Sequence, residues 1–386
     1  MMKKMKLWMV VFGLMFMISC GSAKDGPEVA QSPEPPQVTM RDITAQELIS
    51  EIKVGWNLGN TFDAKGGETA WGNPYTTKEM IDAVAEKGFN CIRIPVSWYQ
   101  ASGDAPEYLL EEEWMNRVEE VVNYALDNEM YVIINTHHEE SWLKPDKEHA
   151  ETSKTILAAY WKQIAERFRD YDEHLLFEGM NEPRIIGSEH EWDGGDSDGR
   201  QIIDELNQIF VDTVRATGGN NEIRCLLITS YAAANAENAI RRLAIPEDEH
   251  IGVSIHAYQP YLFTYNAEGG YPDWTPHNQR GALESLFMRL DKYFISKGIP
   301  VIITEFGAER KRMEQEDGKK GYNDAEVEEW VRAYITEARE AGIPCIWWDN
   351  GQTAGGNEIF GVFNREKCTW VRENVVDALI EESRKE

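Results

Sequence analysis

Eight short apolar runs recur along the chain at intervals of roughly 25 to 50 residues, and this repetition restricts the fold more than any other feature. Most of the runs are rich in β-branched residues or Leu without strict alternation, which is typical of strands covered on both faces. The runs are Val54–Asn60, Asn90–Val96, Tyr131–His137, Leu175–Glu182, Cys225–Ser230, Ile251–Tyr258, Pro300–Glu305 and Cys345–Asp349.

Amphipathic helical stretches fill the gaps between these runs. Thr77–Lys87 begins with a residue that caps helices well and ends at Gly88, a typical helix stop. In Glu111–Glu129 the apolar residues recur at helical spacing. The other helical stretches are Gln279–Ser296, Asp324–Ala341 and Val371–Ser383. Eight β/α units predict an α/β fold, the (β/α)8 TIM barrel, and an open doubly wound sheet is the alternative.

The chain has a strongly acidic balance of charge. It contains 67 Asp and Glu residues against 39 Lys and Arg residues, so its formal net charge is −28. Such a field repels nucleic acids, anionic membrane surfaces and acidic polysaccharides. We therefore expect no nucleic-acid partner and a neutral ligand, although an acidic surface also serves solubility alone.

The cysteines do not suggest a disulfide framework. Cys91, Cys225 and Cys345 lie in the second, fifth and eighth runs, which are not neighbours in a closed barrel. Buried free thiols are therefore expected. The chain has no CxxC or HExxH pattern, so the sequence predicts neither a metal site nor a cofactor.

Two glutamates close apolar runs. Glu182 ends the fourth run in Asn181-Glu182-Pro183, and Glu305 ends the seventh in Thr304-Glu305-Phe306-Gly307. Carboxylates at the ends of barrel strands can face each other across a bond between two sugars. The pair therefore predicts an enzyme that cleaves glycosidic bonds.

Other strand ends are also polar. Alternation directs Arg93 toward the barrel axis, where a charge is costly unless paired, and Glu305 is the natural partner. A purely structural ion pair is the alternative. Alternation also directs His137 inward and His138 outward, so His137 is expected to bond within a site, and His138 is either a site or a structural residue. Alternation directs His256 inward as well. The alternative to a site residue here is a histidine that is hydrogen-bonded within the core.

Seven motifs, in this order along the chain, closely resemble those of glycoside hydrolase family five, a clan A family of (β/α)8-barrel retaining β-glycanases. The motifs are Gly55–Asp63, Arg93–Trp98, Asn135–Glu139, Asn181–Pro183, His256–Tyr258, Thr304–Gly307 and Trp347–Gly351. The resemblance extends from about Ile43 to the C-terminus. The opening motif, the double histidine and the Trp-Trp-Asp-Asn-Gly run are most similar to the endoglucanase and xyloglucanase branch.

The resemblance implies roles for individual residues. Glu182 matches the family's general acid/base and Glu305 its nucleophile. Asn181 matches the residue that binds the sugar 2-hydroxyl. Trp348 matches the aromatic platform beneath the sugar next to the cleaved bond.

Further positions match supporting residues of the family. Arg93 and Tyr258 match the residues that hold the nucleophile ionised and oriented. His137 and His256 match partners in the substrate and acid/base network, and Asn57 lies in the opening motif. Physical reasoning agrees, because Arg93 and Tyr258 would keep Glu305 charged, while Glu182 has no obvious cation partner and can stay protonated.

Aromatic residues in predicted loops are candidate sugar platforms, because ring faces suit the apolar patches of sugars. These candidates are Trp71, Trp142, Trp192, Tyr261 and Trp274, with loop packing as the alternative for each. Platforms spread around the barrel mouth predict a groove open at both ends and attack within polymer chains.

The chain is therefore expected to be a retaining endo-β-1,4-glucanase and a monomer. Its expected substrates are neutral plant cell-wall polysaccharides, namely cellulose, mixed-linkage β-glucan and xyloglucan. Alternatives are an endo-β-1,4-mannanase or xylanase on the same barrel, or a lipid-anchored glycan-binding protein without catalysis. Loop shape decides among substrates, so the sequence does not rank them.

The N-terminus carries the pattern of a secretion signal. Lys3, Lys4 and Lys6 precede the apolar run 7–18, and Ser19-Cys20-Gly21 resembles a lipoprotein cleavage box. We expect a signal peptide over residues 1–20 with lipidation of Cys20, a flexible tether over 21–40 and a single catalytic domain over 41–386. The protein is then anchored by lipid, at the outer membrane or surface of a Gram-negative cell, with cleavage alone as the alternative.

Overall fold

The eight predicted runs form one closed barrel in the computed structural model, which describes residues 40–265, 270–314, 320–356 and 358–385. The order around the barrel is β1-β10-β7-β6-β5-β4-β3-β2, and the neighbouring strands run parallel. The open doubly wound sheet is therefore wrong. The barrel strands are β1 (Val54–Asn57), β2 (Cys91–Ile94), β3 (Tyr131–Asn135), β4 (Leu175–Glu178), β5 (Leu226–Ala234), β6 (Ile251–His256), β7 (Val301–Phe306) and β10 (Cys345–Trp347).

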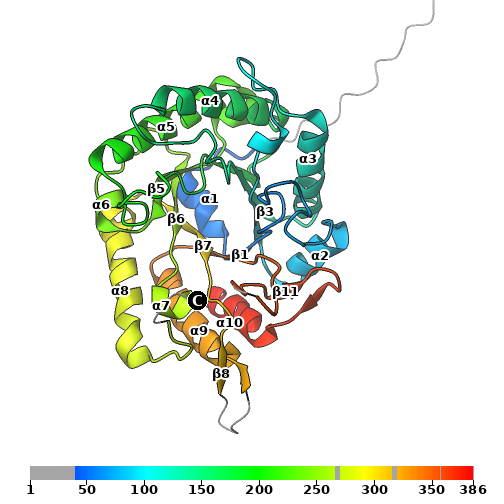
Figure 1. Cartoon of the computed structure of the whole chain (residues 1–386), viewed down its shortest axis with the longest axis vertical. Coiled ribbons are helices and arrows are strands. Elements are labelled where there is room, and N and C mark those ends of the chain that lie inside the picture. Colours follow the sequence, from blue (N-terminus) through cyan, green and yellow to red (C-terminus); the bar gives the residue numbers. More distant parts are fainter. Residues whose placement is uncertain (1–39, 266–269, 315–319, 357, 386) are drawn as a thin grey trace, which may run out of the picture. The chain divides into compact units, whose positions relative to one another are not determined.

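Helices surround the barrel and cover the outer face of its strands (Figure 1). Apart from α1 (Ala45–Glu51), which lies at the centre of the ring in Figure 1, they are α2 (Lys78–Lys87), α3 (Glu112–Leu126), α4 (Ala150–Arg167), α5 (Ser197–Ala216), α6 (Glu237–Ile240), α7 (Tyr261–Thr264), α8 (Pro276–Tyr293), α9 (Asp324–Glu340) and α10 (Glu373–Ser383). Short 3-10 helices are η1 (Tyr99–Ala101), η2 (Gly219–Glu222) and η3 (Ile295–Lys297). Two antiparallel hairpins that the sequence did not predict are β8 (Arg312–Glu314) with β9 (Lys320–Tyr322) and β11 (Phe363–Asn364) with β12 (Thr369–Trp370).

Local sequence sets several helix ends. Gly88 ends α2 in the left-handed conformation, with φ of 113°, as the sequence predicted. Asp196 begins α5, since its side chain accepts a hydrogen bond from the backbone N–H of Gly199 at 2.7 Å. Thr44 and Glu47 form a capping box at the start of α1.

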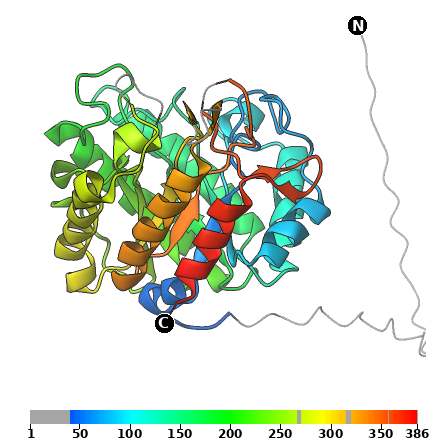
Figure 2. The same cartoon turned by 90° about the horizontal axis from the view of Figure 1, so that it is seen from below.

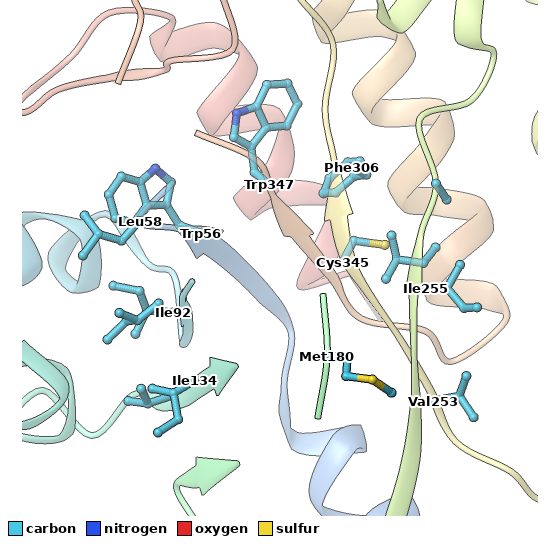
Figure 3. Packing of buried hydrophobic residues seen from close by; sticks show 14 of the residues in the cluster. Trp56, Leu58, Ile92, Ile134, Met180, Val253, Ile255, Phe306, Cys345 and Trp347 are labelled. Carbon is cyan, nitrogen blue, oxygen red and sulfur yellow. The ribbon is translucent and has the colours of Figure 1, made fainter. Parts of the chain in front are cut away.

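Alternation divides the barrel strands between two apolar layers. Trp56, Ile92 and Ile134 on neighbouring strands belong to the layer between barrel and helices, part of which is drawn in Figure 3. Cys91 and Ile133 belong to the layer inside the barrel, which packs against α1. Figure 2 shows α1 at the end of the barrel opposite to the long loops, so α1 closes that end.

A polar layer lies two residues further along seven of the eight strands. These inward residues are Asn57, Arg93, Asn135, Glu178, Thr229, Ser254 and Thr304, and all of them are buried. Buried polar groups require partners, which here are mostly one another. The layer therefore supports whatever stands at the carboxyl ends of the strands.

Two further expectations concern cysteines and membranes. Cys91, Cys225 and Cys345 are buried free thiols, as predicted. Within the described part of the chain, no helix is both long enough and apolar enough to cross a bilayer.

Candidate active site

The two predicted glutamates lie side by side at the carboxyl end of the barrel. One carboxylate oxygen of Glu182, one of Glu305 and a ring nitrogen of His256 all lie within 4.8 Å of one another. A separation of about 5–5.5 Å between carboxyl groups suits a nucleophile and an acid/base, whereas a wider gap would admit a water molecule between them. The pair is therefore built for double displacement at a sugar.

A bulge in β7 turns Glu305 into the site. Ile255 of β6 pairs with Ile303, but the next residue, His256, pairs with Glu305, so Thr304 is skipped. The Thr304 hydroxyl lies 2.5 Å from that of Ser254 inside the barrel, and strict alternation would then send Glu305 outward to the helices. The extra residue lets both side chains face inward. The sequence pattern does not reveal this bulge.

Glu305 is held by cationic and neutral donors. Arg93 Nη1 donates to Oε1 of Glu305 at 2.6 Å, which confirms the predicted ion pair, and the Tyr258 hydroxyl donates to Oε2 at 3.0 Å. Burial and the charge of Glu305 raise the pKa of Tyr258 well above its ordinary value, so this hydroxyl stays a donor. Both contacts stabilise the ionised carboxylate.

Arg93 also binds a second buried carboxylate, Glu178, which we did not predict as a site residue. Arg93 Nε donates to Glu178 Oε2 at 2.8 Å, and Asn135 donates to the same oxygen at 2.8 Å. Burial lowers the pKa of Arg93, but the charges of Glu178 and Glu305 raise it more, and the guanidinium stays charged. Alternation places Glu178 inward at the level of Arg93, and that signal could have identified it.

The two asparagines of the prediction also contact Arg93. Arg93 Nη1 donates to Asn57 Oδ1 at 3.0 Å and Nη2 donates to Asn181 Oδ1 at 2.7 Å. Asn57 in turn donates to the backbone carbonyls of Thr304 and Trp347, so it ties β1 to β7 and β10. Asn57 is thus a support, while Asn181 stands beside Glu182 at the open end.

Glu182 has two cationic neighbours, and the expectation that it has none is wrong. His256 Nδ1 lies 2.8 Å from Oε1 of Glu182, and Arg184 Nη1 lies 3.5 Å from Oε2. Arg184 follows two residues later on the same loop, where it pairs with Glu191 and stacks 4.1 Å from the ring centre of Trp192. Loop residues escape the alternation rule, so the sequence could not place this guanidinium.

His256 and Glu182 share a proton. Burial raises the pKa of Glu182, but the hydrogen bond and charge of His256 and the charge of Arg184 lower it more, and it ends below its ordinary value. Burial lowers the pKa of His256, but the charges of Glu305 and Glu182 raise it above 6.5. Both shifts favour the state in which His256 carries the proton, 2.8 Å from Glu182.

The two adjacent histidines differ in environment. His137 is buried, 3.2 Å from Asn135, with its ring parallel to that of Trp348 at 6.0 Å. Burial and then the positive charges around it, His138 first, lower the pKa of His137 well below 6.5, so it is neutral. His138 is half-buried and bonds Glu140 at 3.0 Å, and its ring lies 5.6 Å from that of Trp71.

Trp348 follows the last barrel strand, β10, and is half-buried. Its position requires a glycine opposite it, because a Cβ on Gly59 would lie 2.8 Å from the indole. The indole therefore lies against the β1 loop and the ring of His137. Its role as an aromatic platform beneath a sugar stays a prediction.

The predicted loop platforms divide into two groups. Trp71, Trp192 and Tyr261 are 43%, 58% and 53% exposed and remain candidates. Trp142 is only 7% exposed, donates from Nε1 to Glu139 at 2.6 Å and packs on Tyr160, which favours loop packing, and its contact with substrate stays a prediction. Trp274 is buried too. The sequence predicts that these residues lie in loops, but it does not predict the direction in which each ring points.

A second cluster at this end of the barrel consists of residue types that can bind a metal. Ligand atoms of Asp63, His137 and His138 lie within 4.8 Å of one another. Asp63 already accepts hydrogen bonds from the backbone N–H groups of Asn60 and Thr61 at 2.9 and 2.7 Å. These bonds give the carboxylate a structural role in the β1 loop, and hydrolysis by paired carboxylates requires no metal.

Comparisons with known proteins agree with this geometry. The family model for cellulase (glycosyl hydrolase family 5) matches residues 57–354. The chain is 54% identical to endoglucanase A of Ruminococcus albus, over 89% of this chain and 94% of that protein. A solved broad-specificity endoglucanase from Clostridium acetobutylicum superposes with a TM-score of 0.83 at 41% identity, covering 88% of this chain and all of that one. A solved xyloglucan-specific endo-β-1,4-glucanase from a metagenomic library, in complex with cellotriose, does so with a TM-score of 0.83 at 44% identity, covering 87% and 98%.

Proposed function

The chain belongs to glycosyl hydrolase family 5, and we propose that Glu305 is its nucleophile and Glu182 its general acid/base. It is an endo-β-1,4-glucanase that hydrolyses internal bonds of β-glucan. The observation that carries the assignment is the close carboxylate pair, in which Arg93 binds Glu305 and His256 binds Glu182. Each carboxylate thus has the partner that its role requires.

The first step forms a glycosyl-enzyme. Glu305 Oε attacks the anomeric carbon while Glu182 gives a proton to the departing glucosidic oxygen. That proton reaches Glu182 from His256 Nδ1 across their hydrogen bond. As the charge of Glu305 passes into the ester, His256 loses one of the two charges that hold its proton, which favours this transfer.

The second step reverses the first. Glu182, now ionised, takes a proton from a water molecule, and the oxygen of that water displaces Glu305 from the anomeric carbon. Two inversions retain the β-configuration. Arg93 and Tyr258 stabilise Glu305 as it departs. We assign to the amide of Asn181 the hydrogen bond to the sugar 2-hydroxyl, a contact that strengthens in the transition state.

Arg184 is expected to set the alkaline limit of activity. The alkaline limb of kcat/KM reports loss of the proton shared by Glu182 and His256. Arg184 stabilises ionised Glu182, so Arg184→Gln should make that proton harder to lose and move the alkaline limb to higher pH. Arg169→Gln, which removes the same charge from an exposed position, is the matched control. Equal profiles for both variants would contradict the role of Arg184.

The exposed aromatics support attack within chains. Trp71 follows β1, Trp192 follows β4 and Tyr261 follows β6, so they stand on different sides of the barrel mouth. A groove open at both ends admits a polymer in mid-chain. Each occupied subsite adds binding energy that the transition state can use.

We further propose that both xyloglucan and mixed-linkage β-glucan are substrates, with mannan and xylan as poor ones. The names of similar proteins, which include broad-specificity and xyloglucan-specific endoglucanases, support this proposal. Initial rates on barley glucan, xyloglucan, galactomannan and xylan, with viscosity and reducing ends followed together, test it. Viscosity should fall steeply while few reducing ends form. Faster hydrolysis of galactomannan, or small products with unchanged viscosity, would overturn the proposal.

The cellular address remains a proposal, because residues 1–39 lie outside the part of the chain that the structure describes. We propose a lipoprotein anchored through Cys20, tethered by residues 21–40 to a monomeric catalytic domain at the surface of a Gram-negative cell. Cys20→Ala should release the enzyme from the membrane fraction with unchanged specific activity. A variant that stays in the membrane fraction would exclude the anchor.

A further inference from the structure

Asn135 is a fully buried residue at the end of β3, and its side chain joins the polar layer of the barrel to His137. Its Oδ1 accepts a hydrogen bond from the backbone N–H of Val96 at 3.1 Å. Its Nδ2 lies 2.8 Å from Oε2 of Glu178 and 3.2 Å from Nδ1 of His137. Both ends of this amide therefore have partners.

The partners of Asn135 fix which end of its amide is which. The backbone N–H of Val96 can only donate, so the atom that faces it must be the amide oxygen. Oε2 of Glu178 is an acceptor, since Arg93 donates to it at 2.8 Å, so the atom that faces it must be the amide nitrogen. Asn135 thus directs its two N–H bonds toward Glu178 and His137.

Glu178 makes the reversed orientation of Asn135 costly. The Ser254 hydroxyl donates to Oε1 of Glu178, and Arg93 donates to Oε2, so the carboxylate is held from both sides. A flipped amide would set its oxygen 2.8 Å from Oε2 of Glu178, and it would also turn an N–H group toward the N–H of Val96. Both contacts would be repulsive, and burial makes lost hydrogen bonds more expensive.

The orientation of Asn135 decides the protonation state of His137. The amide nitrogen donates, so Nδ1 of His137 must accept. A charged imidazole has a proton on each nitrogen, and the Nδ1–H tautomer has its proton at this atom, so neither form can accept here. The form that remains is the neutral ring with its proton on Nε2. Burial and the charges of His138 and Arg93, which lower the pKa of His137 well below 6.5, agree with a neutral ring.

His137 stands beside the loop that carries the acid/base. The backbone carbonyl of Thr136 accepts from the backbone N–H of Asn181, the residue before Glu182, at 2.9 Å. Nε2 of His137 makes no hydrogen bond within the part of the chain that the structure describes, yet it is not sealed from the surface. Nε2–H is therefore a donor without a protein partner at the edge of the site.

We propose that Asn135, held in orientation by Glu178, is a positioning residue that keeps His137 in its Nε2–H form. The ring of His137 then meets the substrate as a hydrogen-bond donor only, and the sugar oxygen that faces it must accept. The proposal rests on the β-glucanase function above. It adds a role in the reaction for two buried residues that lie outside the carboxylate pair.

Nitrogen NMR of the wild type tests the tautomer without any measurement of activity. The histidine rings are labelled with the magnetic isotope of nitrogen, and the signals of His137 are identified by their absence in His137→Gln. Nitrogen shifts and couplings to the ring C–H protons distinguish the two tautomers and the charged ring. We expect a protonated Nε2 and a bare Nδ1 near neutral pH. An Nδ1–H ring, an even mixture of tautomers or a charged ring would overturn the proposal.

Asn135→Asp is expected to reverse the tautomer. Aspartate keeps the acceptor for Val96 but places an oxygen where Nδ2 faced Glu178 and His137. Two carboxyl groups this close share one proton, and the new oxygen can still accept from Nδ1–H of His137. The protonated nitrogen of His137 should therefore change from Nε2 to Nδ1, and kcat/KM on barley glucan should fall about 10-fold or more. An unchanged Nε2–H signal would overturn the role of Asn135.

The same change in a His137→Gln background separates positioning from general damage. The amide of a glutamine reaches the place of Nε2 and has its own N–H donor, which depends on no ring tautomer. Asn135→Asp should then lower kcat/KM by no more than about twofold. Equal losses in both backgrounds would indicate damage to the fold and would overturn the proposal.

Asn207→Asp is the matched control, because Asn207 is also fully buried and bonds the backbone of Thr229 through both ends of its amide. It should leave the signals of His137 and the specific activity of the folded protein unchanged. A wild type that is inactive on β-glucans would refute the proposed function, whereas the NMR result on the tautomer would stand. The two proposals can therefore fail separately.

Discussion

Glu305→Ala is expected to reduce hydrolysis of every β-glucan by about 10⁴-fold or more, because no other group can form the covalent intermediate. Glu182→Ala should behave differently. A substrate with a good leaving group can still form the intermediate, which then accumulates because no base activates water. Azide needs no base, so it should restore turnover and give a β-glycosyl azide.

In this experiment each of the two variants serves as the control for the other. Turnover of an aryl β-glucoside oligomer is measured with and without azide, and the anomer of the azide product is determined. Rescue of Glu305→Ala instead, with an α-azide as its direct displacement product, would leave Glu305 as nucleophile. A β-azide from Glu305→Ala and no rescue of Glu182→Ala would reverse the assignment.

Arg93→Met is expected to cost about 3–5 kcal/mol of unfolding free energy, since it leaves the buried carboxylates of Glu178 and Glu305 without their shared cation. The same change should lower kcat of the folded protein by about 10²–10³-fold, the usual cost of one preorganised donor. Adding Glu178→Gln should recover part of the stability but not the activity, because Glu305 still lacks its guanidinium.

Arg224→Met is the matched control for this prediction. Arg224 is another fully buried arginine, but it donates to backbone carbonyls, including those of Phe168 and Leu175, below the barrel's polar layer. Its loss should destabilise the protein and leave the specific activity of the folded fraction unchanged. Denaturant unfolding and kinetics at low temperature measure both quantities. Normal kcat in folded Arg93→Met would refute the role of Arg93.

The barrel was predictable because strands that are buried on both faces leave runs of apolar residues in the sequence. Such runs can be recognised without knowledge of the tertiary structure. Strands between two apolar layers are mainly apolar, as β2 and β3 are apart from Arg93 and Asn135 in the polar layer. The same alternation placed Arg93 inward and so led to its pairing with Glu305. It also places Glu178 inward at the level of Arg93, so the second ion pair of Arg93 leaves a signal in the sequence too.

Other features depend on contacts that alternation does not encode. The bulge that turns Glu305 inward is a matter of register between β6 and β7. The charge beside Glu182 comes from Arg184, whose direction is set by a loop and by stacking on Trp192. Trp142 is an aromatic residue of the kind that can stack on a sugar, but its indole N–H donates to the buried carboxylate of Glu139. Side-chain contacts of this kind decide the conformation of a loop. The spacing of residues along the chain does not predict these contacts.

The anomer of the first product tests the close carboxylate pair most directly. Wild-type enzyme is mixed with a cello- or xyloglucan oligosaccharide in an NMR tube, and the anomeric protons of the new reducing end are followed before mutarotation. Double displacement by Glu305 and Glu182 predicts that the β-anomer forms first and the α-anomer grows in later. An initial α-anomer would show that water attacks directly, and would contradict the covalent intermediate on Glu305.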